Sequence, residues 1–500
     1  MTADWWPPKG DCVVTDAADA PSVPANPADK AVIVVGGGVA GLVAALECAK
    51  VGMNVTVLER DTRVGGVIRR EDVGGVGVDL AADGFSTRGG VVAAVLDEVG
   101  LGDAVIRPDH AGRWIAGATG VAPLPAETVF GIPANAWADD VRRHIGWSGA
   151  WRAYLDRLRP PLTIGQEQSL GRLVRTRMGD RVRDRLVAPL SVGGYAVDPD
   201  DVVVDDVAPG LNAALTRTGS LAGAVAAVRA ERDGAGEGLA GLSGGMSRIV
   251  DGLAARLDDF GVEIRTEAPV TGIRRSPDVG ARPWLVQTGD EAVAADAVVV
   301  AVDEDAARAL LADAAPQLTS LAVDVAPTVP LESITLVFDA PGGAVDRPGP
   351  VVHAVPGTRR ASTLLHQTGR WDGLRAEAGE DGVVARVTFG GPGDPPATAA
   401  LDDAAATAMA LAEASALLAL PLDGVRLRGA RRYRYEQPPP ATARGRAERA
   451  TRARAALAAA PGIAVVGAWL AGTGLAQVVE DAVVEADALR RGVLFGGVAG

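Results

Sequence analysis

The sequence predicts an α/β protein of two domains, one of which is threaded by three separate segments of the chain. A glycine-rich turn stands near the start, between an apolar run and a helical pattern. Similar α/β patterns return in the middle and near the end, separated by stretches of unlike character. At 500 residues, the chain is also too long to fold around one compact core. Together these observations favour one dinucleotide-binding domain of the Rossmann type, with an α+β domain inserted into it.

The first expected elements form a βαβ unit. Residues 31–35 are a run of small and β-branched apolar side chains, which is typical of a buried parallel strand. A turn over 36–41 follows, then a helix over 42–51 and a second strand over 54–58. Before them, residues 1–29 are rich in proline and small polar side chains, and we expect a disordered leader there.

The rest of the chain alternates between two characters. Arg-rich helical segments with proline breaks fill much of residues 123–230, whereas residues 244–302 return to an α/β pattern. In chain order we expect further helices over 91–99, 169–190, 246–260 and 400–420, and further strands over 262–266, 284–288, 297–301, 331–338, 383–389 and 463–466.

The turn at residues 36–41 has the spacing of a dinucleotide-binding motif. Gly36, Gly38 and Gly41 satisfy G-x-G-x-x-G. The first glycine allows a tight turn, the second lets the backbone approach a pyrophosphate, and the third lets the helix pack on the strand. The helix N-terminus then offers N–H groups and a partial positive charge to the phosphates. Glu59 ends the second strand 18 positions after Gly41, near the spacing at which an acid binds a ribose hydroxyl. The motif does not separate NAD from FAD.

Composition argues against several other classes of protein. A net charge of −14 disfavours a general nucleic-acid binder, because phosphates would be repelled. No window offers the roughly 18 apolar residues of a membrane-spanning helix, and the first 30 residues lack the pattern of a signal peptide. The four histidines show no metal-ligand spacing, so we expect no metal site. Cys12 and Cys48 are not expected to form a disulfide, which fits a reducing cytoplasm.

The residues after Glu59 help to distinguish between NAD and FAD. Arg63, Gly65 and Gly66 form R-x-G-G, and residues 79–85 read Asp-Leu-Ala-Ala-Asp-Gly-Phe. Here the chain resembles the FAD-dependent amine oxidase and protoporphyrinogen oxidase superfamily, in which R-x-G-G and then a D-L-G-type segment follow the ribose acid. Four further stretches resemble those of the porphyrinogen oxidases: 187–199 (P-L-x-x-G-x-Y-A-x-D-P), 244–257 (G-G-x-x-x-L-x-x-A-L), 433–438 (W-x-x-x-x-P) and 467–475 (G-A-Y-L-G-G-x-G-L). The matches run from about residue 31 to 490, and their order makes the set specific.

The resemblance implies FAD as the cofactor and a Rossmann-type FAD-binding domain. The implied parts are a leader (1–29), three FAD-binding segments (30–105, 236–305 and 431–490), a helical substrate-domain segment (106–235), a second substrate-domain segment (306–430) and a tail (491–500). The implied cofactor-binding residues are Gly36, Gly37, Gly38, Val39, Ala40, Gly41, Glu59, Arg60, Arg63, Gly65, Gly66, Val67, Ala81, Ala82, Asp83, Gly84, Val270, Tyr433, Thr473, Gly474 and Leu475. The family chemistry requires no protein nucleophile and no metal, so we name no catalytic residue.

Four departures from the family pattern bear on activity. Ala81 and Ala82 replace Gly-Pro, Tyr433 replaces a tryptophan, and Asp303 replaces a common proline. Residues 480–483, Glu-Asp-Ala-Val, replace a small residue, Ser, Gly and Arg. Two acids near the flavin pyrimidine would raise the cost of an anionic reduced flavin, which leaves a weakly active member open.

The reaction that the resemblance implies is oxidation of a porphyrinogen to a porphyrin in heme biosynthesis. Each of three two-electron steps removes a hydride from a bridging carbon and a proton from a pyrrole nitrogen. Molecular oxygen then reoxidises the flavin and is reduced to hydrogen peroxide. The Ala- and Arg-rich composition is typical of a high-GC bacterium, and many such organisms are expected to oxidise the copro form. By this analogy coproporphyrinogen III is slightly preferred over protoporphyrinogen IX. A cytoplasmic protein is expected. Peripheral contact with a membrane and contact with the next enzyme of the heme pathway stay open.

Cations would help to bind the propionate groups of such a substrate. The candidates are Arg142, Arg143, Arg152, Arg172, Arg175 and Arg177. In this arginine-biased chain, a solvated helix face explains any single one of them better. Trp147 and Trp151 lie four positions apart and would line an apolar tetrapyrrole pocket, although ordinary core packing is the simpler interpretation.

Three other functions stay open. A flavin amine oxidase would present an aromatic cage at the flavin, for which Trp469 and Tyr433 are the obvious candidates. A carotenoid desaturase would need longer apolar segments than this sequence contains. A non-catalytic homologue that binds flavin and porphyrin would fit the acids Glu480 and Asp481.

Overall fold

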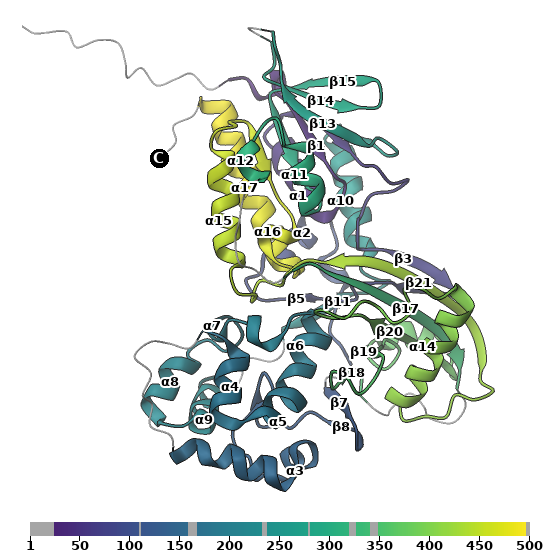
Figure 1. Ribbon diagram of the computed structural model, residues 1–500. Coiled ribbons are helices and arrows are strands. Elements are labelled where there is room, and N and C mark those ends of the chain that lie inside the picture. The colour runs from purple at the N-terminus through teal and green to yellow at the C-terminus, as the bar shows by residue number, and fades with distance from the viewer. Residues whose placement is uncertain are drawn as a thin grey trace, which may run out of the picture.

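A five-stranded parallel sheet forms the centre of the upper domain in Figure 1. The computed structural model describes residues 25–109, 112–158, 168–232, 238–278, 281–319, 327–340 and 349–496. The strand order is β12-β2-β1-β16-β22, with β1 at Ala31–Val35, β2 at Asn54–Leu58, β12 at Glu263–Arg265, β16 at Ala297–Val300 and β22 at Ile463–Val465. Three distant segments of the chain therefore build one Rossmann-type sheet, which confirms the predicted fold class.

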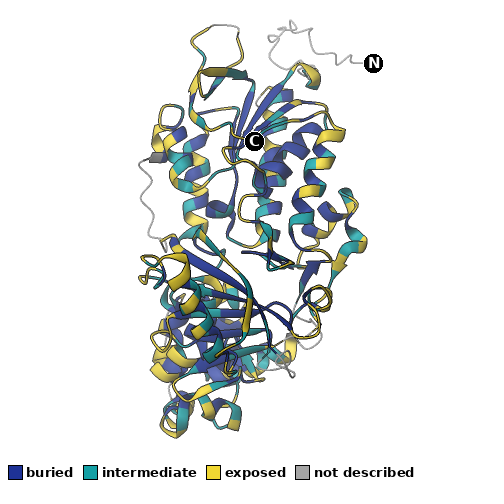
Figure 2. Cartoon of the chain, turned by 90° about the vertical axis from the view of Figure 1, so that its right-hand side faces the viewer, coloured by how far each residue is buried: buried dark blue, intermediate teal, exposed yellow. Residues whose placement is uncertain are grey.

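Helices cover one face of this sheet, and a small sheet with further helices covers the other. Val32 and Val34 pack against α1 (Val39–Ala49), α10 (Ser247–Asp259) and α17 (Leu475–Phe495). Ile33 and Val35 belong to the opposite core, which includes α11 (Glu304–Leu310) and α15 (Arg446–Leu457). All five residues of β1 are buried, as expected of a parallel strand covered on both faces (Figure 2).

The lower domain is built on a seven-stranded mixed sheet of order β21-β17-β20-β19-β18-β7-β8. Helix α14 (Asp403–Leu417) covers one face. The strands are β7 at Arg113–Gly117, β8 at Gly120–Pro123, β17 at Val329–Asp339, β18 at Val351–Ala354, β19 at Ala361–His366, β20 at Gly382–Phe389 and β21 at Arg426–Gln437. β21 runs through residue 430, so this sheet continues past the boundary expected there.

A helical subdomain sits beside this sheet (Figure 1). Its helices are α3 at Asp139–Tyr154, α4 at Leu170–Met178, α5 at Asp180–Val182, α6 at Ala188–Tyr195, α7 at Val204–Val207, α8 at Leu211–Thr218 and α9 at Leu221–Arg232. The stretch expected to be helical over 169–190 is helical, but it is divided into several elements. Gly179, with φ of 93°, ends α4, and a π-helical turn over Arg183–Val187 separates α5 from α6.

Shorter elements complete the chain. They are β3 at Arg70–Val73, β4 at Val76–Asp79, β5 at Phe85–Ser86, α2 at Val91–Glu98, β6 at Val105–Ile106, β9 at Thr128–Val129, β10 at Ile132–Pro133, β11 at Leu239–Leu242, β13 at Val270–Arg275, β14 at Trp284–Thr288, β15 at Glu291–Ala295, α12 at Pro316–Thr319, α13 at Asp372–Ala378 and α16 at Ala468–Ala471. The other elements expected from the sequence are present with small shifts at their ends.

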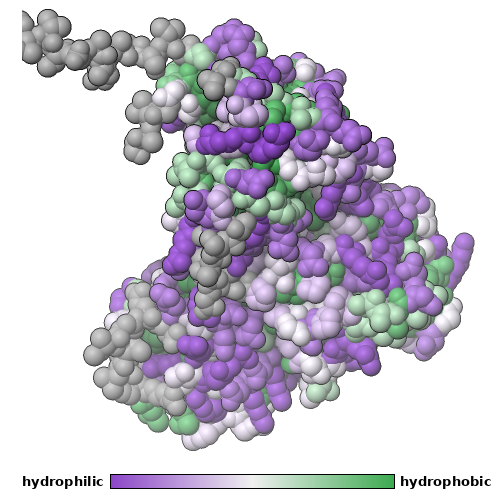
Figure 3. Space-filling view, turned by 45° about the horizontal axis from the view of Figure 1, so that its top comes forward, coloured by the Kyte–Doolittle hydropathy of each residue, from purple (hydrophilic) through white to green (hydrophobic). Residues whose placement is uncertain are grey.

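The ends and the surface add three findings. Residues 1–24 of the expected leader, including Cys12, lie outside the described residues. Its last part is structured, because Pro27–Asp29 form a 3₁₀ turn and the Ala25 amide donates to the Leu494 carbonyl at 2.9 Å. Within the described ranges, no helix is long and apolar enough to cross a membrane. The face shown in Figure 3 is largely hydrophilic, with small hydrophobic patches.

Candidate functional site

The turn after β1 brings the glycines of the motif into three different environments. Gly36 has φ of 103°, and a Cβ there would lie 2.5 Å from the Ala301 carbonyl oxygen. A Cβ on Gly41 would lie 2.0 Å from the Gly36 carbonyl oxygen, so the helix packs against the strand only without a side chain there. At Gly38, by contrast, nothing lies within 4 Å of the Cβ position. Gly36 and Gly41 thus serve the fold, while Gly38 faces open space.

The N-terminus of α1 faces the same space. Gly38 is its N-cap residue, and no side chain caps the helix. An uncapped helix N-terminus presents amide groups and the positive end of the helix dipole, a suitable site for an anion such as a diphosphate. The residues here fit the phosphate portion of FAD.

Glu59 is fixed at the carboxyl end of β2, beside this turn. Its side chain is 8% exposed. Oε2 accepts the Gly37 amide at 2.6 Å, and Oε1 accepts the Asp61 amide at 2.9 Å. Each carboxylate oxygen keeps further acceptor capacity. The arrangement therefore suits a ribose hydroxyl next to the phosphate site.

The R-x-G-G segment lies directly against the glycine turn. The Gly65 amide donates to the Gly37 carbonyl at 2.8 Å, and a Cβ on Gly66 would lie 3.5 Å from the Gly38 Cα. Val67 is 52% exposed, and the side chains of Arg60 and Arg63 are exposed as well. The structure brings this segment to the site expected from the sequence.

The segment over residues 79–84 crosses from the cofactor domain to the seven-stranded sheet. The Asp79 carboxylate accepts the Met246 amide at 3.0 Å. Burial raises the pKa of Asp79 to about 6, against smaller opposing effects of the Met246 amide and Arg70. Its carbonyl oxygen accepts hydrogen bonds from Gln367 (3.1 Å) and Arg386 (3.2 Å).

The far end of this segment is held by an ion cluster. Asp83 pairs with Arg370 at 3.1 Å and with Arg386 at 3.6 Å, and the Trp371 indole donates to it at 3.4 Å. Burial alone would raise the pKa of Asp83, but the two arginines hold it below its ordinary value. Ser333 donates to the Leu80 carbonyl at 3.0 Å. The sequence motifs do not include Ser333, Gln367, Arg370 or Arg386, which converge only through the fold.

Three other implied positions border the same region. Tyr433 on β21 is half-buried and stacks on Tyr435, with ring centroids 5.7 Å apart. Arg69 lies 5.8 Å above the Tyr433 ring, and burial raises the pKa of Tyr433. Val270 begins β13, two residues after Ala268, whose amide donates to the Glu59 carbonyl at 2.9 Å. Thr473 to Leu475 lead into α17, which packs along α1.

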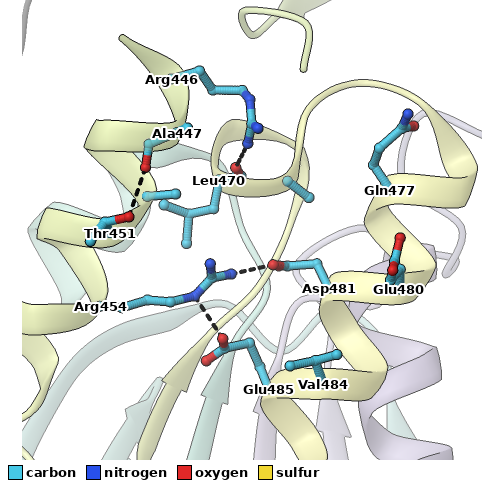
Figure 4. A pocket seen from close by; sticks show the side chains of 12 residues that line it. Arg446, Ala447, Thr451, Arg454, Leu470, Gln477, Glu480, Asp481, Val484 and Glu485 are labelled. Carbon is cyan, nitrogen blue, oxygen red and sulfur yellow. Dashed lines mark hydrogen bonds and ion pairs between the residues drawn. The ribbon is translucent and has the colours of Figure 1, made fainter. Parts of the chain in front are cut away.

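Two acids of α17 face α15. Asp481 and Glu485 pair with Arg454 of α15, the latter at 2.7 Å, and line an open pocket between the two helices (Figure 4). Ala482, the next residue, is fully buried in the core that contains α1. Burial raises the pKa of Asp481, opposed by Arg454. Arg454 is shared by Asp481 and Glu485, so it offsets only part of the charge of the two acids. Asp303, the departure from proline, caps α11 by accepting the Ala306 amide at 2.9 Å.

Most of the candidate arginines of the helical subdomain have structural partners. Arg177 pairs with the buried Asp156 at 2.6 Å, Arg152 donates to backbone carbonyls at the end of α4, and Arg175 pairs with Asp200 at 3.3 Å. Arg142 pairs with Asp139, whereas Arg143 and Arg172 are exposed. None of these contacts points to a substrate.

The interpretation of Trp147 and Trp151 as core residues is wrong. They are 70% and 58% exposed. Both follow Gly146, whose φ of 69° breaks α3, and they share one helix face as their spacing predicts, but this face is exposed. The two indoles contact Trp137, at ring distances of 6.2 and 6.0 Å, and Tyr154 joins the group. We call these four residues the aromatic cluster.

The fold and the glycine turn define a dinucleotide-binding protein of the Rossmann type. The model of the family of flavin-containing amine oxidoreductases matches residues 39–489. Coproporphyrinogen III oxidase of Mycobacterium tuberculosis H37Rv is 30% identical over 454 residues, which cover 88% of this chain and 93% of that protein. Protoporphyrinogen oxidase 2 of Arabidopsis thaliana is 28% identical over 184 residues, 36% of each chain.

Solved structures agree on the fold. A proposed protoporphyrinogen oxidase from Exiguobacterium sp. 255-15 superimposes with a TM-score of 0.79 at 24% identity, covering 92% of this chain and 98% of that one. A UDP-galactopyranose mutase gives 0.68 at 14% identity, covering 93% and 95%. The chain belongs to the flavin-containing amine oxidoreductase family, and within it to the FAD-dependent protoporphyrinogen and coproporphyrinogen oxidases. Its cofactor is FAD.

Proposed function

We propose that this protein oxidises a porphyrinogen to the porphyrin with molecular oxygen, releasing hydrogen peroxide, and that coproporphyrinogen III is preferred over protoporphyrinogen IX. The observation that carries this proposal is the 30% identity to coproporphyrinogen III oxidases over 88% of the chain. When bound, FAD supplies the two-electron oxidation. The protein's own part is to bind, orient and exclude water.

We assign each part of FAD to the residues that the geometry of the site places beside it. The α1 N-terminus and the glycine turn hold the diphosphate, and Glu59 holds the adenosine ribose. Residues 63–67 and 81–84, together with Tyr433 and residues 473–475, border the flavin. Val270 meets the adenine through its backbone.

Two other functions are less well supported. An amine oxidase cage would need two accessible aromatic rings, but Trp469 is 3% exposed and belongs to the core. A non-catalytic porphyrin carrier was favoured by the acids of α17, yet Asp481 is paired with Arg454. Both observations leave porphyrinogen oxidation as the best-supported function.

An anaerobic titration tests the proposal. The purified, FAD-loaded protein is mixed in turn with coproporphyrinogen III, protoporphyrinogen IX and a panel of primary amines, and the visible flavin absorption is followed. We expect the flavin band to bleach with coproporphyrinogen III, more slowly with protoporphyrinogen IX, and to stay unchanged with amines. Readmitted oxygen should restore the band with formation of peroxide. Bleaching by amines alone, or by none of these compounds, would contradict the proposal.

We also propose that the aromatic cluster makes peripheral contact with a membrane. Tryptophan and tyrosine prefer the interface between lipid and water, and Leu158, next to the cluster, is 75% exposed. Arg142 lies 4.0 Å above the Trp147 ring, and Arg157 lies 5.4 Å above the Tyr154 ring. These cations would favour anionic headgroups although the whole chain carries −14.

A further inference from the structure

We infer that Arg386 is a positioning residue for the flavin: from the seven-stranded sheet it holds the flavin-lining segment 79–84 and supplies positive charge on that side. The inference deepens the proposed function, because it rests on the proposed place of this segment beside the flavin. Nothing in the motif pattern of the sequence singles out this arginine.

Arg386 lies on β20, opposite Thr335 of β17, on the sheet face that turns away from α14. It is only 9% exposed. Its two Nη groups reach two points of the segment, the Asp79 carbonyl at 3.2 Å and the Asp83 carboxylate at 3.6 Å. A guanidinium with a rigid fork of donors is suited to fixing two acceptors at once.

Neighbouring side chains donate hydrogen bonds to the same segment. Gln367 donates to the same Asp79 carbonyl at 3.1 Å, and Ser333 donates to the next carbonyl, that of Leu80, at 3.0 Å. Three side chains on the side of the seven-stranded sheet, those of Ser333, Gln367 and Arg386, therefore hold the two successive carbonyls of Asp79 and Leu80. We call Ser333, Gln367, Arg370 and Arg386 the platform.

Arg386 lies between two carboxylates: it shares that of Asp83 with Arg370, and its charge also acts on the buried carboxylate of Asp79, so it offsets negative charge along the segment. Two-electron reduction of a bound flavin adds negative charge, and buried positive charge on that side favours it. Loss of Arg386 should therefore make the bound flavin harder to reduce.

The chain offers a matched control in Arg432 on β21. Its side chain is 12% exposed and pairs with the buried Glu332 at 2.8 Å, so it is also a buried arginine with a buried acid. It lies opposite Ile334, on the α14 face of the same sheet, and donates to the Leu401 carbonyl at 2.8 Å. Replacing it removes a comparable interaction on the side away from the segment.

The experiment compares Arg386→Gln, Arg386→Lys and Arg432→Gln with the wild type, all loaded with FAD. The midpoint potential of the bound flavin is measured by titration against a reference dye, and thermal unfolding is followed in parallel. We expect Arg386→Gln to lower the ratio of reduced to oxidised flavin about tenfold at a fixed potential, equivalent to about 30 mV for two electrons. Arg386→Lys, which keeps the charge, should lose less than half of that. Arg432→Gln should lose stability but leave the potential unchanged.

The outcomes separate this inference from the proposed function. No porphyrinogen is present, so the result is independent of whether the protein oxidises one. An unchanged potential in Arg386→Gln, or an equal shift in Arg432→Gln, would overturn the inference. If Arg386→Gln folds but no longer retains FAD while Arg432→Gln does, positioning is supported. If Arg386→Gln fails to fold, the decision passes to Arg386→Lys: a changed flavin spectrum or potential supports the inference, and wild-type values overturn it.

Discussion

The two sides of the proposed flavin site are built in different ways. The cofactor side consists mainly of backbone: the glycine turn, the uncapped end of α1 and the R-x-G-G segment, with Glu59 as its main side chain. The opposite side consists of side chains, since the platform residues hold the carbonyls and carboxylate of residues 79–83. A backbone-built site depends on where side chains are absent, whereas a side-chain-built site depends on which groups the fold brings together.

The largest effect on FAD binding is expected at Gly38 and tests the backbone-built side. Gly38→Val places methyl groups in space where nothing lies within 4 Å of the Cβ position. The N-cap has φ of −68° and ψ of 170°, which valine also adopts, so the fold should tolerate the change. FAD affinity should fall at least about 100-fold, or roughly 2.8 kcal/mol. Isothermal titration of the FAD-free protein with FAD measures it.

Gly41→Val is the informative contrast. There a Cβ would lie 2.0 Å from the Gly36 carbonyl oxygen, so this variant should lose folding itself. If Gly38→Val bound FAD normally, the open space in front of it would not be the diphosphate site, and the distinction between the two sides would fail.

This contrast also explains what the sequence revealed. The glycine spacing, the strand before it and the acid after it are local, so Gly36 to Gly41 and Glu59 were identified from pattern alone. Arg386 and Gln367 lie some 300 positions from Asp79 and meet it only in the folded chain. In an arginine-rich sequence, nothing distinguishes Arg386 from the arginines on the surface. Trp147 and Trp151 do share one helix face, but their spacing does not tell whether that face is covered, and here it is exposed.

The second prediction concerns Asp79, on the platform side, and the pH dependence of stability. Its pKa is about 6 in the folded protein and 3.8 in its ordinary state. The folded state therefore binds more protons between these values, so the contribution of Asp79 to stability falls as pH rises from about 4 to 6. Above that window its charge should cost on the order of 3 kcal/mol. Urea unfolding of FAD-free protein from pH 4 to 7 measures it.

Asp79→Asn isolates this group from the many other acids that titrate in the same window. The amide oxygen can still accept the Met246 amide, but the charge is gone. The variant should match the wild type near pH 4 and be more stable above pH 6. If the difference in unfolding free energy between Asp79→Asn and the wild type did not change with pH, Asp79 would carry no such cost. The platform side would then be no more sensitive to protons than the backbone-built side.

The smallest effect on the site is expected from the aromatic cluster, which belongs to neither side. In Trp147→Ser/Trp151→Ser, unfolding free energy should change by no more than about 0.5 kcal/mol per site, because both rings are mostly exposed. FAD affinity should stay the same, whereas co-sedimentation with phosphatidylglycerol vesicles should be lost.

Phe260→Ser is the matched control: Phe260 is 39% exposed, and Arg256 lies 4.6 Å above its ring at the end of α10 in the other domain. Equal loss of vesicle binding in both would argue against the cluster as the contact, since removal of any exposed ring would then suffice. A changed FAD affinity in the tryptophan variant alone would show that the helical subdomain contributes to the flavin site, which would then have a third side.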